Sequence, residues 1–290
     1  MSKKKLKKAL WRSASVLLLM ALMVVSKQLG VLPVSATPPE EFQLHFIDVG
    51  QGDAMLLTCA GKTAIIDAGT PDSRGQLLTY LHTHGVSKPT YIFATHPHFD
   101  HIGGMGAVVD AFGCKTFVMP RATSNTQTFE GMLGSVSYTG AELVYAKEGD
   151  KFEMGDVTFE VLSPPEGQET SNLNETSLVL LVRYGEYSFL LTADAEKANE
   201  KVYSKLIDEP VTVMKAAHHG SSTSNSKYLL SAAQPKFIVI SCGLNNPFGH
   251  PHPSVMKRFK KLDCTILRTD QQGSVVFTIK GGELSYETER

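Results

Sequence analysis

The chain has 290 residues, of which 42% are apolar, 20% charged and 8% aromatic. These proportions are those of a folded globular protein and exclude a disordered, collagen-like or coiled-coil chain. The formal net charge is −1, but residues 1–36 hold seven basic residues and no acidic one, so the rest of the chain carries a net charge of −8. A general basic surface for nucleic acid is therefore absent, and an anionic substrate must be held locally by a metal ion or a few aimed donors.

The first 36 residues have the pattern of a targeting segment. A lysine-rich stretch (residues 3–8) precedes 14 uncharged residues (13–26), and a small-x-small sequence ends at Ala36. Fourteen helical residues span about 21 Å, less than the ~30 Å hydrocarbon core of a bilayer. We expect a cleaved signal peptide and a secreted or extracellular protein, with an uncleaved anchor at the cell envelope as the alternative. A linker, residues 37–41, and one domain, residues 42–290, follow.

The four cysteines are Cys59, Cys114, Cys242 and Cys264. Their spacing excludes a C-x-x-C metal or redox pair. Because each lies in or beside an apolar run, we interpret them as buried thiols. In an exported protein, two disulfides are the alternative.

The predicted elements form two similar halves. The first half has strands at 42–49, 54–59, 63–67, 91–95 and 116–119, and helices at 73–84, from 103–106 onward and within 122–139. The second has strands at 143–145, 157–162, 177–184 and 187–192, then helices at 195–206, 226–233 and 254–262 alternating with strands at 211–216, 237–242 and 265–268, and a terminal hairpin, 274–279 with 283–287. A β-rich block followed by αβ units, repeated once, predicts an α/β fold: a four-layer αβ/βα sandwich with two sheets packed face to face and helices outside.

The densest cluster of reactive side chains follows the strand at 91–95. His96, His98, Asp100 and His101 lie within six residues, and two glycines follow them. Imidazole and carboxylate together suit Zn²⁺, with Mn²⁺ or Fe²⁺ as alternatives. In an extended loop His96 and His98 point the same way, while Asp100 and His101 can turn toward a second ion.

This H-x-H-x-D-H pattern resembles the metal-binding signature of the metallo-β-lactamase superfamily. The resemblance covers roughly residues 42–290 and continues in Asp67 at a strand end, Asp194 after a later strand, and the pair His218-His219. It implies a hydrolase with the four-layer fold and divalent metal ions held by His96, His98, Asp100, His101, Asp194 and His219. In this resemblance Asp194 bridges two ions, and His219 is favoured over His218 as the ligand because His-Gly is the usual pairing in the superfamily. Asp67 then orients a ligand histidine, or it is a simple turn residue.

A narrower resemblance is to the hydrolase domain of ComEC-type competence proteins. It is carried by four segments, DVGQGDA (48–54), HHGS (218–221), GHPHP (249–253) and RTDQQG (268–273). The resemblance implies a phosphodiesterase that acts on DNA. The chain departs from the pattern at His98, where ComEC-type loops often have aspartate, and it lacks the large transmembrane channel segment of a full competence protein.

A further ligand histidine, which the superfamily has between the metal loop and Asp194, is missing. Residues 102–193 contain no histidine, and Asn174 occupies about that place. Because an amide oxygen is a weaker ligand than imidazole, we expect two unequal metal sites, the weaker one at His96 and His98. The tighter site draws on the four remaining ligands, Asp100, His101, Asp194 and His219.

The expected reaction is attack on phosphorus by water that the metal ions activate. The residues expected to take part in catalysis are Asp100, His218 and Asp67, with His218 as a proton donor. The residues expected to bind substrate are Asn174, Ser221, His250, His252, Arg268 and Asp53. Ser221 opens the helix at 226–233, whose N-terminus can receive an anion. The alternatives are a turn residue for Asp53, a solvated strand end for Arg268 and a surface loop for the two histidines.

We therefore expect an exported metal-dependent hydrolase, with Zn²⁺ favoured and Mn²⁺ as the alternative. The favoured substrate is a phosphodiester, with DNA among the candidates. A β-lactam, a lactone or a choline phosphodiester of the envelope is the alternative substrate, and a non-catalytic binding module is the alternative class. No separate protein partner is evident, and contact with a membrane is expected only through the N-terminal segment.

Overall fold

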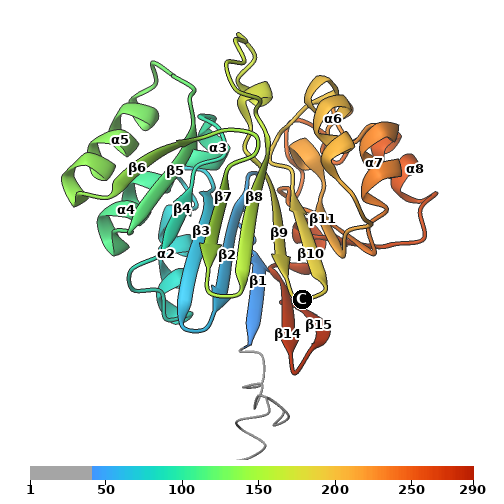
Figure 1. Cartoon of the computed structure of the whole chain (residues 1–290), viewed down its shortest axis with the longest axis horizontal. Coiled ribbons are helices and arrows are strands. Elements are labelled where there is room, and N and C mark those ends of the chain that lie inside the picture. Colours follow the sequence, from blue (N-terminus) through green and yellow to red (C-terminus); the bar gives the residue numbers. More distant parts are fainter. Residues whose placement is uncertain (1–40) are drawn as a thin grey trace, which may run out of the picture. The chain divides into compact units, whose positions relative to one another are not determined.

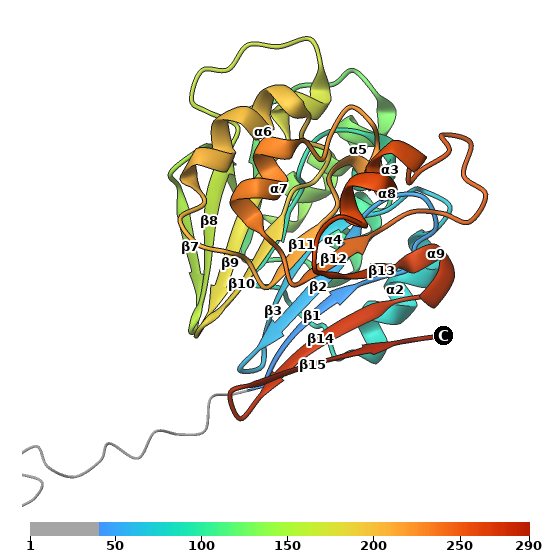
Figure 2. The same cartoon turned by 90° about the vertical axis from the view of Figure 1, so that its right-hand side faces the viewer.

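The computed structural model describes residues 41–290, so the predicted targeting segment and all of the linker except Glu41 lie outside the described residues. In the described part, two β-sheets pack face to face and helices cover their outer faces, as Figure 1 and Figure 2 show. The predicted four-layer αβ/βα sandwich is confirmed.

The first sheet has the spatial order β15-β14-β1-β2-β3-β4-β5-β6. Its strands are β1 (Phe42–Phe46), β2 (Ala54–Cys59), β3 (Lys62–Ala68), β4 (Tyr91–Phe93), β5 (Thr116–Pro120), β6 (Glu142–Ala146), β14 (Val275–Lys280) and β15 (Glu283–Thr288). Strands β3 to β6 run parallel, and the others pair antiparallel.

The second sheet has the order β13-β12-β11-β10-β9-β8-β7. Its strands are β7 (Lys151–Met154), β8 (Val157–Ser163), β9 (Val179–Tyr184), β10 (Tyr187–Leu191), β11 (Val213–Lys215), β12 (Phe237–Ile240) and β13 (Thr265–Arg268). Here β10 to β13 are the parallel strands.

The helices of the first half are α2 (Arg74–Thr83), α3 (Phe99–Ile102), α4 (Met105–Phe112) and α5 (Gln127–Thr139). Those of the second half are α6 (Lys197–Tyr203), α7 (Lys227–Ala233), α8 (Pro253–Phe259) and α9 (Thr269–Gln272), with short 3₁₀ turns η1 (Leu173–Thr176), η2 (Ser204–Leu206) and η3 (Ala217–Gly220). Local sequence starts several of them. The Thr126 hydroxyl caps α5 by accepting from Phe129 N, Ser226 caps α7 in the same way, and α8 begins at a proline, whose missing N–H costs nothing there.

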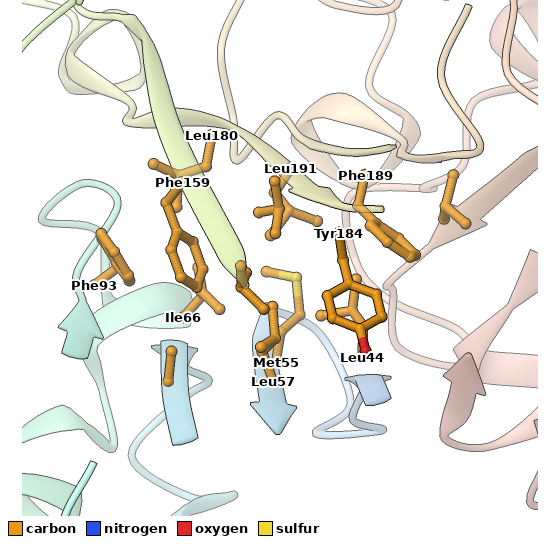
Figure 3. Packing of buried hydrophobic residues seen from close by; sticks show 14 of the residues in the cluster. Leu44, Met55, Leu57, Ile66, Phe93, Phe159, Leu180, Tyr184, Phe189 and Leu191 are labelled. Carbon is orange, nitrogen blue, oxygen red and sulfur yellow. The ribbon is translucent and has the colours of Figure 1, made fainter. Parts of the chain in front are cut away.

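The central core lies between the two sheets. Met55 and Leu57 of β2 belong to this core together with Leu180 of β9 and Phe189 of β10, and Figure 3 shows these side chains in the layer between the two sheets. The alternate residue of β2, Leu56, faces the outer helices instead. Strands covered on both faces need apolar residues at every position, which explains the continuous apolar runs of these central strands.

Three expectations about the strands are wrong. The terminal hairpin was placed in the second half, but β14 pairs with β1 and the hairpin belongs to the first sheet. The strand predicted at 143–145 does not belong to the second β-block, because β6 pairs parallel with β5 and completes the first sheet. Strand β7 was not predicted, since Lys151 and Glu153 alternate with Phe152 and Met154 at the exposed edge of the second sheet and give only a weak apolar signal.

The described cysteines are not joined in disulfides; three are buried and Cys264 is half-buried. This agrees with their interpretation as buried thiols. Within residues 41–290, no helix has the length and apolar character needed to cross a membrane.

Candidate metal centre

The candidate site lies where the parallel strands of both sheets end. Asp67 stands near the end of β3, and the loop 95–101 follows β4. Asp194 follows β10 and His219 lies in η3, directly after β11. The carboxyl ends of neighbouring parallel strands meet at one sheet edge, so the two halves of the fold bring these side chains together.

The centre of the site is a buried group of four residues, Asp100, His101, Asp194 and His219, whose ligand atoms all lie within 4.8 Å of one another. His101 Nε2 is 3.3 Å from Asp194 Oδ1, and His219 Nε2 is 3.4 Å from Asp100 Oδ2 and 3.5 Å from Asp194 Oδ2. His101 Nε2, His219 Nε2 and Asp194 Oδ1 are buried and lack a hydrogen bond within the described residues. Buried polar atoms are rarely left in this state, so their convergence fits a shared divalent cation.

The pKa shifts of the two histidines in this group also indicate a site for a cation. Burial alone lowers the pKa of His101, but the Asp194 and Asp67 carboxylates outweigh burial and raise the pKa well above its ordinary value. Against the same effect of burial, Asp194 and Asp53 raise the pKa of His219 to about 9. The surrounding carboxylates thus favour a positive charge at this position, which a divalent cation would supply when it binds the neutral imidazoles.

The imidazoles of His101 and His219 are each held through Nδ1, the ring nitrogen that faces away from the four-residue group. Asp67 Oδ2 lies 2.7 Å from His101 Nδ1, and its carboxylate accepts from Thr95 N at 2.8 Å and Thr95 Oγ1 at 2.7 Å. His219 Nδ1 lies 2.9 Å from the carbonyl oxygen of Ser241. Each histidine therefore turns its Nε2 toward the four-residue group, which is how ligand histidines are usually oriented. The Asp67 carboxylate lies behind His101, and its role in orienting a metal ligand stays a prediction.

The residues of the predicted weaker site lie beside this group. His96 Nε2 is 3.0 Å from His98 Nδ1. Asn174 Nδ2 donates to Glu196 Oε1 at 3.3 Å, and Asn174 Oδ1 is buried with no hydrogen-bond partner among the described residues. The structure thus brings the two imidazoles and a free amide oxygen to one place. The inequality of the two sites stays a prediction.

The two adjacent histidines after β11 occupy different environments. His219 is buried in the four-residue group, whereas the His218 side chain is 22% exposed, with Nε2 3.6 Å from Asp194 Oδ2 and Nδ1 3.2 Å from Thr223 Oγ1. Both have left-handed backbone conformations, φ 51° and 54°, which are strained for residues other than glycine. In this backbone conformation both imidazoles face Asp194.

An open pocket leads to this cluster. Its lining includes His98, Asp100, Asn174, Asp194, His218 and His219. The other lining residues are Gln51, Phe99, Phe248 and His250, of which the sequence had predicted only His250.

Asp53 cannot bind substrate, so that prediction is wrong. It is fully buried, with Oδ2 2.8 Å from Lys215 Nζ and Oδ1 3.5 Å from His219 Nδ1. Gly52 lets this turn close beneath the metal loop, because a Cβ at that position would lie 2.2 Å from the carbonyl oxygen of Asp100. Asp53 therefore contacts Lys215 and His219 on the buried side of the site, away from the pocket.

Arg268, which was expected to bind phosphate, does not face the pocket. Its guanidinium binds Asp270 through two hydrogen bonds, 2.9 Å from Nε and 2.6 Å from Nη2, and does not line the pocket. His252 also has a partner within the protein, because its Nδ1 accepts a hydrogen bond from Ser222 N at 2.8 Å. Like Arg268, it does not line the pocket.

The helix start near Ser221 is already occupied. The buried Glu200 carboxylate accepts from the backbone N–H of Ser226 at 2.7 Å and also from that of Asn225. Ser221 is itself buried and bonds to Thr223. The N-terminus of α7 thus has an internal anion, and the expected anion site there is wrong.

Lys215, the last residue of β11, was not predicted from the sequence as part of the site. Its side chain is fully buried, and Nζ lies 2.8 Å from Asp53 Oδ2, 3.0 Å from Ala193 O and 3.1 Å from Ala216 O. A single lysine in an otherwise apolar strand, three residues before His218, was the signal that could have revealed it. Glu196, which accepts from the amide of Asn174, was not predicted either.

A family model described as "Metallo-beta-lactamase superfamily" matches residues 47–243. ComE operon protein 3 of Bacillus subtilis is 31% identical over 83% of this chain and 33% of its own length, and Recombination protein 2 of Haemophilus influenzae is 30% identical over 81% and 28%. Competence protein ComA of Neisseria gonorrhoeae is 29% identical over 85% and 34%. The chain thus spans about a third of the length of these curated relatives. They confirm the predicted resemblance to ComEC-type proteins.

Solved structures show the same fold. CmlA, a diiron β-hydroxylase from Streptomyces venezuelae, matches with a TM-score of 0.57 and 14% identity over 83% of this chain and 54% of its own. YhfI from Bacillus subtilis, a metallo-β-lactamase fold protein, matches with a TM-score of 0.55 and 14% identity over 85% of this chain and 100% of its own.

Proposed function

We propose that this chain, which belongs to the metallo-β-lactamase superfamily, is a metal-dependent phosphodiesterase that cleaves DNA. The observation that carries the proposal is the convergence of the buried ligand atoms of Asp100, His101, Asp194 and His219 at an open pocket. The names of the relatives concern competence and recombination, which favours a nucleic-acid phosphodiester over a β-lactam or a lactone.

The donor set fits Zn²⁺ best, with Mn²⁺ as the alternative. The tighter ion would be held by the four residues of the buried group, and a weaker ion by His96 and His98 with Asn174 and Asp194. When bound, such ions supply a Lewis acid for the phosphoryl oxygens and lower the pKa of bound water toward ~7.

The residues of the chain position the substrate around these ligands. His218 and His250 line the same pocket and offer ring N–H groups to the phosphoryl and leaving oxygens. Asp67 holds His101 in its ligand orientation, and Glu196 holds the Asn174 amide. The pocket is open to solvent, as a site for a long polymeric substrate must be.

The test is hydrolysis by the purified full-length chain loaded with Zn²⁺ or Mn²⁺. We expect turnover of bis(p-nitrophenyl) phosphate and of DNA, and none of nitrocefin. Asp194→Ala should lose both metal, measured by elemental analysis, and turnover, because a carboxylate shared by two ions is removed. Asp110→Ala, which changes an exposed aspartate on α4, is the matched control and should keep both. Turnover of nitrocefin alone would overturn the proposal.

We also propose that the chain is exported, by a targeting segment at residues 1–36. The support is the order of lysine-rich, uncharged and small-x-small stretches. Mass spectrometry of the protein from its native cells should find an N-terminus near Thr37 outside the cytoplasm. An intact Met1 on a cytoplasmic form would refute export, and an intact Met1 in membranes would assign the anchor.

A further inference from the structure

Two exposed phenylalanines stand at the mouth of the metal pocket. Phe99 is 54% exposed and Phe248 is 49% exposed, and both line the pocket. Single exposed apolar residues are common on protein surfaces, but two on one concave site mark a place where a ligand covers them. Phe99 belongs to the metal loop of the first half of the fold, and Phe248 to the loop after β12 in the second half. Each half therefore contributes one aromatic ring.

The ring of Phe248 is held in place. It stacks on His250, with ring centroids 5.7 Å apart and an angle of 23° between the planes, and His250 stacks on His219 at 6.1 Å and 28°. The loop is closed by Asn246, whose side chain donates to the carbonyl oxygens of Gly243 and His250 and accepts from His250 N. Phe248 thus ends a stack of rings that leads to a candidate metal ligand, and it needs little ordering when a ligand binds.

The charge of the chain restricts what this ligand can be. Residues 41–290 carry 21 basic and 28 acidic residues, a net charge of −7. Proteins bind duplex DNA mainly through basic residues on the phosphate backbone, and this chain has no such excess. A single strand also carries phosphates, but stacking of its bases on aromatic side chains adds about 1–3 kcal/mol per base to the contacts that hold the phosphates, and it requires a base whose face is free. In a duplex the neighbouring bases cover those faces.

We propose that Phe99 and Phe248 stack on unpaired nucleobases beside the scissile phosphodiester, so that the substrate is single-stranded nucleic acid or a single-stranded end. This inference rests on the proposed phosphodiesterase activity and adds its substrate class. The metal group holds the phosphate, and the two rings select the bases that flank it.

The experiment compares two single-stranded oligonucleotides of equal length and charge, a dT 12-mer and a 12-mer of abasic tetrahydrofuran nucleotides. The measured quantity is the ratio of kcat/KM for the two substrates, with the full-length chain loaded with Mn²⁺ or Zn²⁺. The wild type should prefer the dT oligomer, and Phe248→Ala should reduce the preference about tenfold, the loss expected for one stacked base. Tyr138→Ala is the control, because Tyr138 is 90% exposed on α5 and does not line the pocket; it should keep the wild-type ratio.

Phe99 lies between two candidate ligands, so its variants need a separate readout. Phe99→Trp should retain the preference for bases and Phe99→Ala should lose it, with the metal content of each measured. If Phe99→Ala loses metal, the inference is tested by Phe248→Ala alone, through its ratio of kcat/KM for the dT and abasic oligomers. Binding is followed in the metal-loaded protein by the fluorescence of 2-aminopurine in a cleavage-resistant phosphorothioate oligomer, which stacking on Phe248 should quench.

The outcomes separate the two proposals. If neither oligomer is cleaved with either metal, the phosphodiesterase proposal fails. If both are cleaved at equal rates, or a duplex of the same sequence is cleaved faster than the dT oligomer, the phosphodiesterase stands and the stacking inference is refuted. If the preference is present and Phe248→Ala leaves it unchanged, the assignment to these rings is refuted.

Discussion

Replacing Lys215 with methionine should destabilise the protein strongly, although it changes a single side chain that touches no substrate. The Lys215 ammonium is fully buried beneath the metal group and lies within 3.1 Å of three acceptors, Asp53 Oδ2, Ala193 O and Ala216 O. Methionine has a similar length and no charge, so the volume is kept while all three contacts are lost.

The magnitude follows from what is left behind. Removing one partner of a buried ion pair leaves an uncompensated charge and costs about 3–5 kcal/mol. Here that charge is the Asp53 carboxylate, and the two carbonyl oxygens also lose their donor. Since a typical domain is stable by only about 5–15 kcal/mol, the variant should remain folded with much of its stability gone. The metal should bind more weakly as well, because Lys215 holds the backbone just before Asp194, at Ala193, whose left-handed φ of 47° is strained.

Urea unfolding followed by circular dichroism measures this free energy by linear extrapolation. The double variant Lys215→Met/Asp53→Asn removes the unpaired charge, so it should be more stable than Lys215→Met alone. A loss of less than about 1 kcal/mol in Lys215→Met, the size of one ordinary hydrogen bond, would refute the reasoning. A double variant whose loss of unfolding free energy equals the sum of the losses in the two single variants would refute it as well.

Two further predictions concern the metal ligands and the response to pH. Asn174→His should strengthen the weaker metal site, because an imidazole replaces an amide oxygen. Titration of the metal-free variant with Zn²⁺ should show two tight binding events, whereas the wild type should show one tight and one weak event. Two tight events in the wild type would contradict this prediction. Burial, together with the charge of His84, lowers the pKa of His45 to about 4. Because the folded-state pKa lies below the unfolded value of about 6.5, stability is fully present above pH 6.5 and falls as the pH drops toward 4, by up to about 2 kcal/mol between pH 6.5 and 5. His45→Gln should lose correspondingly less stability than the wild type over this range, measured by urea unfolding at each pH, and equal losses in both proteins would show that His45 does not titrate in this way.

The sequence predicted the architecture and the centre of the site because both depend on local patterns. Continuous apolar runs identify strands buried on both faces, and ligands placed directly after such strands must meet at one sheet edge. Asp100, His101 and Asp194 each follow a strand that was predicted within one or two residues. Their meeting with His219 needed only the alternation of strands and helices and a family pattern.

The errors arose where a side chain has a partner far away in the sequence. Asp53 in a glycine-rich turn has the pattern of an exposed loop, and only the close approach of Gly52 to Asp100 shows that the turn lies beneath the metal loop. Arg268 is a different, local case: its guanidinium pairs with Asp270, two residues away, and the position at a strand end does not show this. No local pattern reveals that Lys215 and Asp53 meet across the two halves of the fold.

The charges of the site explain how an acidic chain could attract an anionic substrate. Four carboxylates, those of Asp53, Asp67, Asp100 and Asp194, surround the centre, and Lys215 is the buried cation among them. With neutral imidazoles the group carries three net negative charges and would repel a phosphodiester. One divalent ion leaves a single negative charge, whereas two ions make the centre positive. Occupation of the weaker site should therefore decide whether substrate binds, so a phosphate analogue should bind detectably only when the second equivalent of metal is present. Equal binding of the analogue at one and two equivalents, measured by calorimetry, would show that the charge of the centre does not control substrate capture.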